Sequence, residues 1–198
     1  MTLTMPTDPV APAFDHDTVI GRTQIWLEVA VIGLNLCPFA KAVHVHHQIR
    51  FEVSDAATPG ALIDHLTQEL RFLSACDASV VDTTLLILPM MLHDFLDYND
   101  FLDDADRLLV DLQLEGVLQI ASFHPQYQFA GTHPDDITNF TNRSPYPMLH
   151  LLRETSIDRA VEAFPNADEI VDRNLATLQR LGHTGWAALG LQNSQVRS

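Results

Sequence analysis

The chain has 198 residues, of which 46% are hydrophobic and 19% are charged, and its formal net charge is −15 at pH 7. This composition is typical of one globular domain that can bury a core without disulfides. The acidic balance would repel a phosphate backbone, so we expect no nucleic-acid partner. Without a long apolar run, a secretion signal or a disulfide framework, we predict a cytoplasmic protein with no membrane partner.

The N-terminal quarter is predicted to begin with a flexible segment, residues 1–16, which is rich in Pro and has no periodicity. An apolar helix then runs to about Leu36, with Asp17 or Thr18 as its cap. Residues 43–53 alternate between apolar and polar side chains, which predicts a half-exposed strand near a sheet edge. Its polar face is expected to lie in water and contains His44, His46, Gln48, Arg50 and Glu52.

The middle of the chain alternates between helices and buried strands. Thr58 caps a predicted helix over 59–75, and residues 84–88 form a short, continuously apolar strand. A second amphipathic helix spans about 93–114, and another buried strand spans 117–123. Strands that alternate with helices in this way imply right-handed crossovers and a sheet with a parallel core.

The C-terminal part is predicted to hold one more strand, over 148–153, and two helices. Thr155 or Ser156 caps a short helix, and Asn166 caps another helix that Gly182 ends. The whole is therefore a single α/β domain over 17–191, with a mixed sheet that has a parallel core, helices packed on the sheet, and a frayed tail over 192–198.

The residues with functional chemistry concentrate in the stretch Ser122–Glu154. It follows the third predicted strand, and ligands of such sheets bind beyond the carboxyl ends of the strands. Asp55–Glu115 carries thirteen acids and two Arg, so an anionic ligand is better tolerated in Ser122–Glu154, where acids and Arg nearly balance. The candidate catalytic and binding residues of the stretch are His124, Tyr127, Asp135, Asp136, Asn142, Arg143, Ser144, Tyr146 and His150.

Three of these positions define a catalytic hypothesis. His124 is the candidate general acid or base, because its pKa near neutrality suits proton transfer; its alternative role is to bond the loop backbone. Asp135 or Asp136 would orient the ring, although adjacent acids on a loop most often cap a helical turn. Arg143 is the best anion anchor because its planar fork matches a carboxylate or phosphate. Its alternative is an ion pair with one of the two acids that closes the loop.

Cys37 and a metal provide further alternatives. The dipole of the first helix would raise the pKa of the Cys37 thiol if Cys37 ends that helix, and a new turn begun at Pro38 would lower it. A buried structural thiol and a haem ligand are the other roles of this Cys. His124, His133 and His150 with either Asp could surround a metal, but their spacings match no standard metal signature.

Three segments carry a family resemblance: LNLCPFA from Leu34, FHPQYQFAG from Phe123 and TNRSPYPMLHLLRE from Thr141. Together they resemble the bacterial and plastid family called domain of unknown function 1415, over about residues 18 to 182. The resemblance names a family without supplying a reaction, and it leaves the cofactor open. It implies that the family signature includes Cys37, His124, Tyr127, Asn142, Arg143, Ser144, Tyr146 and His150, whereas His133 is not associated with it.

The leading hypothesis is an enzyme, a hydrolase or transferase, that acts on a small anionic metabolite carrying a phosphate or carboxylate. His124 would transfer the proton and Arg143, with Asn142 and Ser144, would hold the anion. A hydroxyl from Tyr127 or Tyr146 would assist, and Cys37 would be a nucleophile. The alternatives are a non-catalytic anion-binding or interaction module and a metal-dependent hydrolase built on His124, Asp135 and His150.

Overall fold

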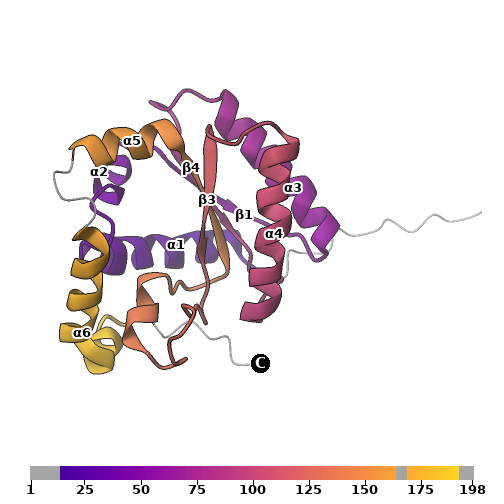
Figure 1. Ribbon diagram of the computed structural model, residues 1–198. Coiled ribbons are helices and arrows are strands. Elements are labelled where there is room, and N and C mark those ends of the chain that lie inside the picture. Colours follow the sequence, from indigo (N-terminus) through magenta and orange to yellow (C-terminus); the bar gives the residue numbers. More distant parts are fainter. Residues whose placement is uncertain (1–13, 164–168, 192–198) are drawn as a thin grey trace, which may run out of the picture.

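The structure of the protein, a computed structural model, describes residues 14–163 and 169–191 (Figure 1). Nearly all of the predicted flexible segment, the predicted cap Asn166 and the predicted tail 192–198 lie outside the described residues.

Within the described residues, four strands form one mixed sheet in the order β1–β2–β4–β3. β1 (Ile49–Val53) pairs parallel with β2 (Thr83–Ile87). β4 (Met148–Arg153) runs antiparallel to both β2 and β3 (Leu118–Phe123). The predicted single α/β domain with a mixed sheet is therefore confirmed.

The position of β4 changes the sheet that the chain order alone suggests. β1, β2 and β3 run in the same direction, but β4 lies between β2 and β3, so direct parallel pairing is limited to β1 and β2. β3 consequently lies at a sheet edge and is mostly half-buried, whereas its apolar sequence predicts a buried strand. β4 takes the central place because Met148, Leu149 and Leu151 are fully buried.

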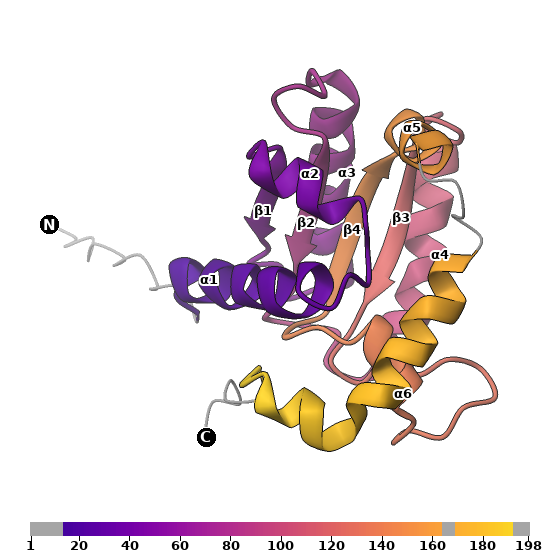
Figure 2. The ribbon, with the colours of Figure 1, turned by 90° about the vertical axis from the view of Figure 1, so that its left-hand side faces the viewer.

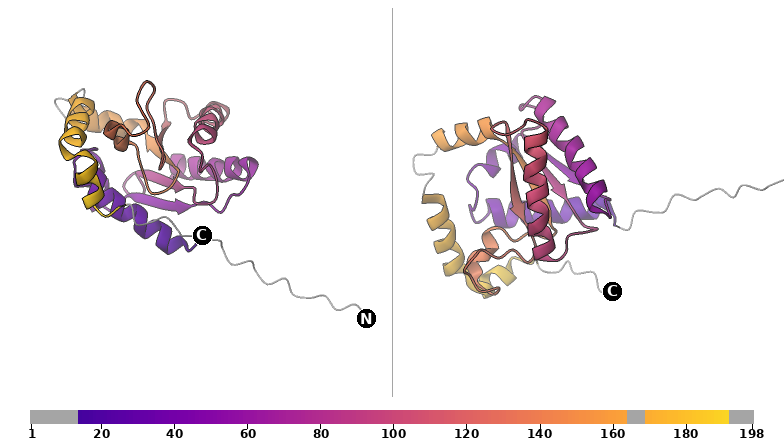
Figure 3. Two further views of the ribbon diagram at one scale, coloured as in Figure 1. Left: turned by 90° about the horizontal axis from the view of Figure 1, so that it is seen from below. Right: turned by 45° about the vertical axis from the view of Figure 1, so that its right-hand side comes forward.

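Helices pack on both faces of this sheet. α3 (Pro59–Ala75) and α4 (Phe95–Asp111) lie side by side on one face (Figure 1). α1 (His16–Trp26) crosses the other face (Figure 2) and continues into the π-helical turn η1 (Leu27–Ile32). Figure 3 (left) shows the strands between α1 and the pair of α3 and α4.

Two hydrophobic clusters follow from the alternation of side chains along the strands. On the α3 and α4 face, the buried side chains include Leu62, Leu66, Leu70, Leu73, Leu86, Tyr98, Leu149 and Leu151. On the α1 face, they include Val19, Trp26, Val53, Leu85, Ile87, Met148, Leu178 and Trp186. The last two come from α6 (Ile170–Ala188), so this helix closes the α1 cluster.

Side-chain caps mark the starts of α1, α3 and α4. Thr58 accepts a hydrogen bond from the Ala61 N–H, as predicted for the start of α3. α1 begins two or three residues earlier than predicted, because Asp15 and not Asp17 or Thr18 is its cap. α5 (Glu154–Ala163) begins directly after β4.

Gly182 does not end α6, contrary to the prediction. Its φ of 61° and ψ of 177° break the helical geometry, but the helix resumes and continues to Ala188. A glycine tolerates this φ without strain and therefore kinks the helix. Beyond the kink, Trp186 is buried in the α1 cluster, and this contact holds the second part of α6 in place.

The strand predicted over 43–53 is wrong in its first half. Residues Ala40–Val45 form α2, His47 turns the chain with φ 56°, and the strand begins only at Ile49. His44 consequently lies on the helix α2, and its Nε2 is 3.2 Å from a carboxylate oxygen of Glu28. The alternation of Val and His over so few residues fits both a helix and a strand, and the turn at His47 limits the strand to the residues that follow it.

Candidate functional site

The stretch Ser122–Glu154 leaves the end of β3, forms loops and the 3₁₀ turn η2 (Ile137–Thr141), and returns as β4. It therefore starts at the carboxyl end of a strand, as the sequence predicts. Most polar side chains of this stretch form hydrogen bonds with other groups of the protein.

His124 is fully buried, and both of its ring nitrogens bond the backbone. Nδ1 accepts a hydrogen bond of 3.0 Å from the Gln126 N–H, and Nε2 lies 3.0 Å from the Leu92 carbonyl oxygen. Because Nδ1 accepts, Nε2 carries the proton and donates it to Leu92, which defines a neutral ring. Burial lowers the pKa of His124 and favours this neutral form. The geometry is that of a His that fastens loops together.

Neither Asp135 nor Asp136 is a hydrogen-bond partner of the His124 ring. Asp135 is exposed, with one carboxylate oxygen 3.9 Å from Nδ1 of His133. Asp136 caps η2 by accepting from the backbone N–H and the hydroxyl of Thr138, and these bonds lower the pKa of its carboxyl. The structure thus places Asp136 in the capping role, and the proposed His124–Asp orientation pair is not formed.

Arg143 closes the loop through backbone oxygens. Its Nε donates to the Tyr127 carbonyl (3.2 Å), one terminal nitrogen donates to the Pro134 carbonyl (2.5 Å), and the guanidinium lies 4.3 Å from the ring centre of Phe140. Burial lowers the pKa of Arg143, and Asp135 opposes this effect from a distance. Among the described residues, no carboxylate forms an ion pair with it.

The amide and the hydroxyls predicted to assist are also engaged. Asn142 Nδ2 donates to the Ser122 carbonyl (3.0 Å), and Ser144 Oγ donates to the Tyr146 carbonyl (2.6 Å). The Tyr146 hydroxyl accepts from Arg22 on α1 (3.2 Å). The Tyr127 hydroxyl lies 3.3 Å from Ser122 Oγ. These bonds tie the signature segment to β3 and α1.

His150 and Cys37 lie in apolar surroundings. Burial in the middle of the sheet lowers the pKa of His150 to about 4, and its Nε2 bonds Thr83 Oγ at 2.8 Å. Cys37 packs against the α1 cluster just before α2, and burial raises the pKa of its thiol. A raised pKa reduces the thiolate fraction, so the thiol has the properties of a structural Cys.

The polar side chains of Ser122–Glu154 are therefore used to hold an irregular segment together. The structure does not assemble His124, His133 and His150 into a shell of metal ligands; the first and last of these are bonded to Leu92 and Thr83. Sequence reasoning located the segment in which the polar residues concentrate, but it could not tell that these groups would bond mainly within the protein.

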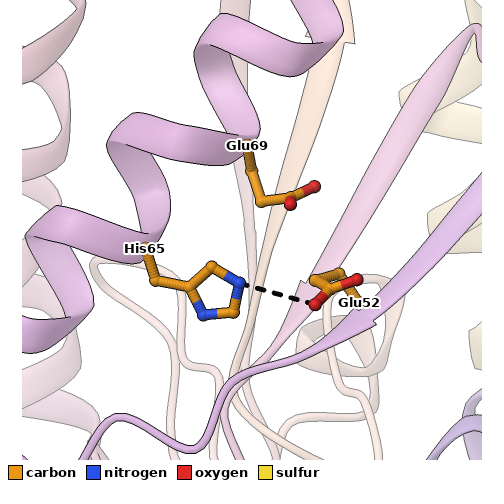
Figure 4. Close-up of side chains that lie close together, drawn as sticks. All are labelled: Glu52, His65 and Glu69. Carbon is orange, nitrogen blue, oxygen red and sulfur yellow. Dashed lines mark ion pairs between the residues drawn. The ribbon is translucent and has the colours of Figure 1, made fainter.

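A different cluster of titratable groups lies on β1 and α3, where the sequence predicts a wet strand face. Glu52, His65 and Glu69 bring one ligand atom each within 4.8 Å of one another (Figure 4). Glu69 is only 5% exposed, and Arg50 donates to both of its carboxylate oxygens (2.8 and 3.1 Å). The polar face of β1 is half-exposed, with the Arg50 and Glu52 side chains 35% and 28% exposed, and Glu69 of α3 bonds Arg50 there. The sequence signal that could have identified this cluster is the position of Glu69 one helical turn after His65, close to the apolar side of α3.

A pocket of about 280 Å³ lies between the chain after η1 and the first part of α6. Within the described residues it is lined by Leu34, Asn35, Ile170, Arg173, Asn174, Ala176, Thr177 and Arg180. We call it the α6 pocket. Two of its residues belong to the LNLCPFA segment, and Asn174 Nδ2 donates to the Leu36 carbonyl of that segment (2.7 Å).

The described residues form a single-domain α/β protein with a four-stranded mixed sheet and a hydrophobic cluster on each face. No helix of the described residues is both long and apolar enough to cross a membrane. The profile of a family described as "Protein of unknown function (DUF1415)" matches residues 18–188, so the chain belongs to this family. No curated protein and no solved structure matches the chain.

Proposed function

We propose that the protein binds a small anionic molecule in the α6 pocket. The observation that carries this proposal is the lining of the pocket: among the described residues it contains Arg173 and Arg180 and no acidic side chain, in a chain with a net charge of −15. Cationic side chains are scarce in this protein, and two of the ten Arg meet at one concave site. An anion would be attracted there and repelled by most of the remaining surface.

The geometry of α6 suits a phosphate or carboxylate. Arg173 and Arg180 are seven residues apart, which corresponds to two helical turns and puts both on one side of the helix. Ile170, Arg173 and Asn174 belong to the first turns of α6, where the positive end of the helix dipole also favours an anion. Thr177, between the two Arg, lies 3.2 Å from the Arg180 guanidinium and adds a hydroxyl.

The size of the pocket limits the ligand to a small molecule. A volume of about 280 Å³ is close to the lower end of the roughly 300–1,000 Å³ that is usual for ligand pockets. A phosphomonoester or a dicarboxylate of a few carbon atoms fits this range. Binding without proton transfer is favoured over the predicted enzyme, because both nitrogens of His124 are bonded to backbone groups.

The first test is a calorimetric titration with inorganic phosphate, glycerol 3-phosphate and succinate. Loss of a charge-assisted hydrogen bond costs about 1.5–3 kcal/mol, so Arg180→Gln should weaken binding at least about tenfold. Arg159→Gln is the matched control, because Arg159 is an exposed Arg of the neighbouring helix α5 whose bonds within the described residues go to Thr155 and Ser156. It should leave binding unchanged.

Arg143→Gln separates this proposal from the anchor predicted in the sequence. If Arg143→Gln abolishes binding and Arg180→Gln does not, the anion binds at the loop and the α6 pocket is not its site. If none of the three anions binds to the unmodified protein, the proposal is refuted. Circular dichroism of each variant ensures that a loss of binding is not a loss of fold.

A further inference from the structure

We propose that Glu52, His65 and Glu69 form a binding site for one divalent transition-metal ion, a site separate from the α6 pocket. The three side chains come from two elements that pack on each other (Figure 4). Glu52 lies on β1, opposite Leu86 of β2, and therefore faces the α3 and α4 side of the sheet. His65 and Glu69 are four residues apart on α3, so they share one helix face.

The distances are close to those of a metal shell. His65 Nε2 lies 3.5 Å from a Glu52 oxygen, and all three ligand atoms lie within 4.8 Å of one another. Neighbouring ligands of a tetrahedral zinc ion are about 3.3–3.5 Å apart, given bonds of roughly 2.0–2.2 Å. The side chains of Glu52 and His65 are 28% and 22% exposed, so small side-chain rotations can bring their ligand atoms to the spacing of a metal shell.

The groups behind the three ligands hold them as second-shell partners hold metal ligands. Ser54 Oγ lies 3.0 Å from His65 Nδ1, which fixes the ring with Nε2 toward the two carboxylates. A bond to one ring nitrogen that leaves the other free is the usual support of a metal-binding His. Arg50 fixes the carboxylate of Glu69 from its side and is itself held 4.8 Å from the ring centre of Phe72.

The charge of the cluster leaves room for a cation. Arg50 also bonds Glu52 (2.6 Å), so one guanidinium serves two carboxylates, and with a neutral His65 the four groups carry a net charge of −1. Glu69 is almost completely buried, where an incompletely balanced charge is costly. A carboxylate oxygen has a second lone pair, so Arg50 can remain bound while the ion occupies the side toward His65.

The ligand types define the class of metal. One imidazole nitrogen with two carboxylates suits zinc, manganese or ferrous iron, whereas calcium and magnesium prefer shells of oxygen. Three protein ligands also leave at least one coordination position for water or a substrate, as in catalytic sites. The same residues could serve only as an ion-pair network that fastens α3 to β1, and the experiment is designed to separate these roles.

The test uses the full chain without an affinity tag, stripped with a chelator that is then dialysed away. Titration with Zn²⁺ and Mn²⁺ by calorimetry, and with Co²⁺ by absorption spectroscopy, should show one equivalent bound. His65→Asn and Glu52→Gln should each weaken this binding at least about tenfold, and Ser54→Ala by about 10–100-fold, the usual cost of losing a second-shell partner. Glu52→Gln keeps the Arg50–Glu69 pair intact, so its fold is expected to survive.

His44→Asn is the matched control, because His44 pairs with Glu28 at the surface and has no third metal-ligating group beside it among the described residues. It should bind metal like the unmodified protein. The cobalt spectrum should also lack the charge-transfer band of a thiolate ligand, which excludes the two free cysteines. An absence of stoichiometric binding, or binding that survives both His65→Asn and Glu52→Gln, would overturn the proposal. No anion is added, so the result is independent of the α6 pocket.

Discussion

The pH dependence of stability should be set in large part by His150. This His lies on the central strand β4, its Nε2 is bonded to Thr83 Oγ, and that hydroxyl donates to the Leu151 carbonyl (2.6 Å). The hydroxyl proton of Thr83 is therefore used, and the ring must be the donor, in its neutral form with the proton on Nε2. Protonation would create a charge with no acceptor in a desolvated place. The replacement His150→Leu removes the titrating group.

The magnitude follows from the two pKa values. Burial lowers the pKa of His150 from 6.5 to about 4 in the folded protein, and the unfolded chain regains the ordinary value. Between these values the unfolded state binds more protons, so the contribution of His150 is complete above pH 6.5 and is lost as the pH falls toward 4. From pH 7 to pH 4.5, the free energy of unfolding should fall by about 2.5 kcal/mol because of this group alone.

Urea denaturation of wild type and His150→Leu at pH 7 and pH 4.5 measures this contribution. At pH 7 the two proteins should differ by about 1 kcal/mol or less, since Thr83 keeps its bond to the backbone. At pH 4.5 the variant should gain about 2.5 kcal/mol relative to wild type. Burial also lowers the pKa of His124, but that residue is present in both proteins and cancels. An equal difference at both pH values would refute the neutral, half-buried His150.

Three further changes test the residues of the signature. His124→Ala should lower the free energy of unfolding, measured by urea denaturation, by about 3–5 kcal/mol, because it leaves a cavity and two unpaired backbone groups. The control His93→Ala changes an exposed His and should lower it by less than about 0.5 kcal/mol. Arg143→Lys should lower the free energy of unfolding by about 1–2 kcal/mol in the same assay, since an ammonium cannot bond both carbonyls in the fork geometry. An unchanged urea midpoint would contradict the loop-closing role of Arg143. In a Cys76→Ser background, Cys37 should react with a thiol reagent at least about tenfold more slowly in the folded protein than in urea. Equal rates in the two states would contradict the structural role of Cys37 and support the hypothesis that it is a nucleophile.

The comparison of sequence and structure shows which signals are local. α3, α4, β2 and β4 were predicted within a few residues, because each combines a clear hydrophobic period with a cap or a breaker in the adjacent sequence. The strand over 43–53 failed in its first half, where the turn at His47 overrides a pattern of only a few alternations. The family motifs were recognised from the sequence, and the match over residues 18–188 confirms them.

The sequence by itself therefore determined most of the helices and strands, the family and the segment in which the polar residues concentrate. Only the tertiary structure decided that β4 lies between β2 and β3, and how the polar groups share their partners. His150 bonds Thr83 across 67 positions, and Arg50 bonds Glu69 from a different element. A side chain's type and period are encoded locally, whereas its availability to a ligand depends on hydrogen-bond partners that are brought to it only when distant segments pack together.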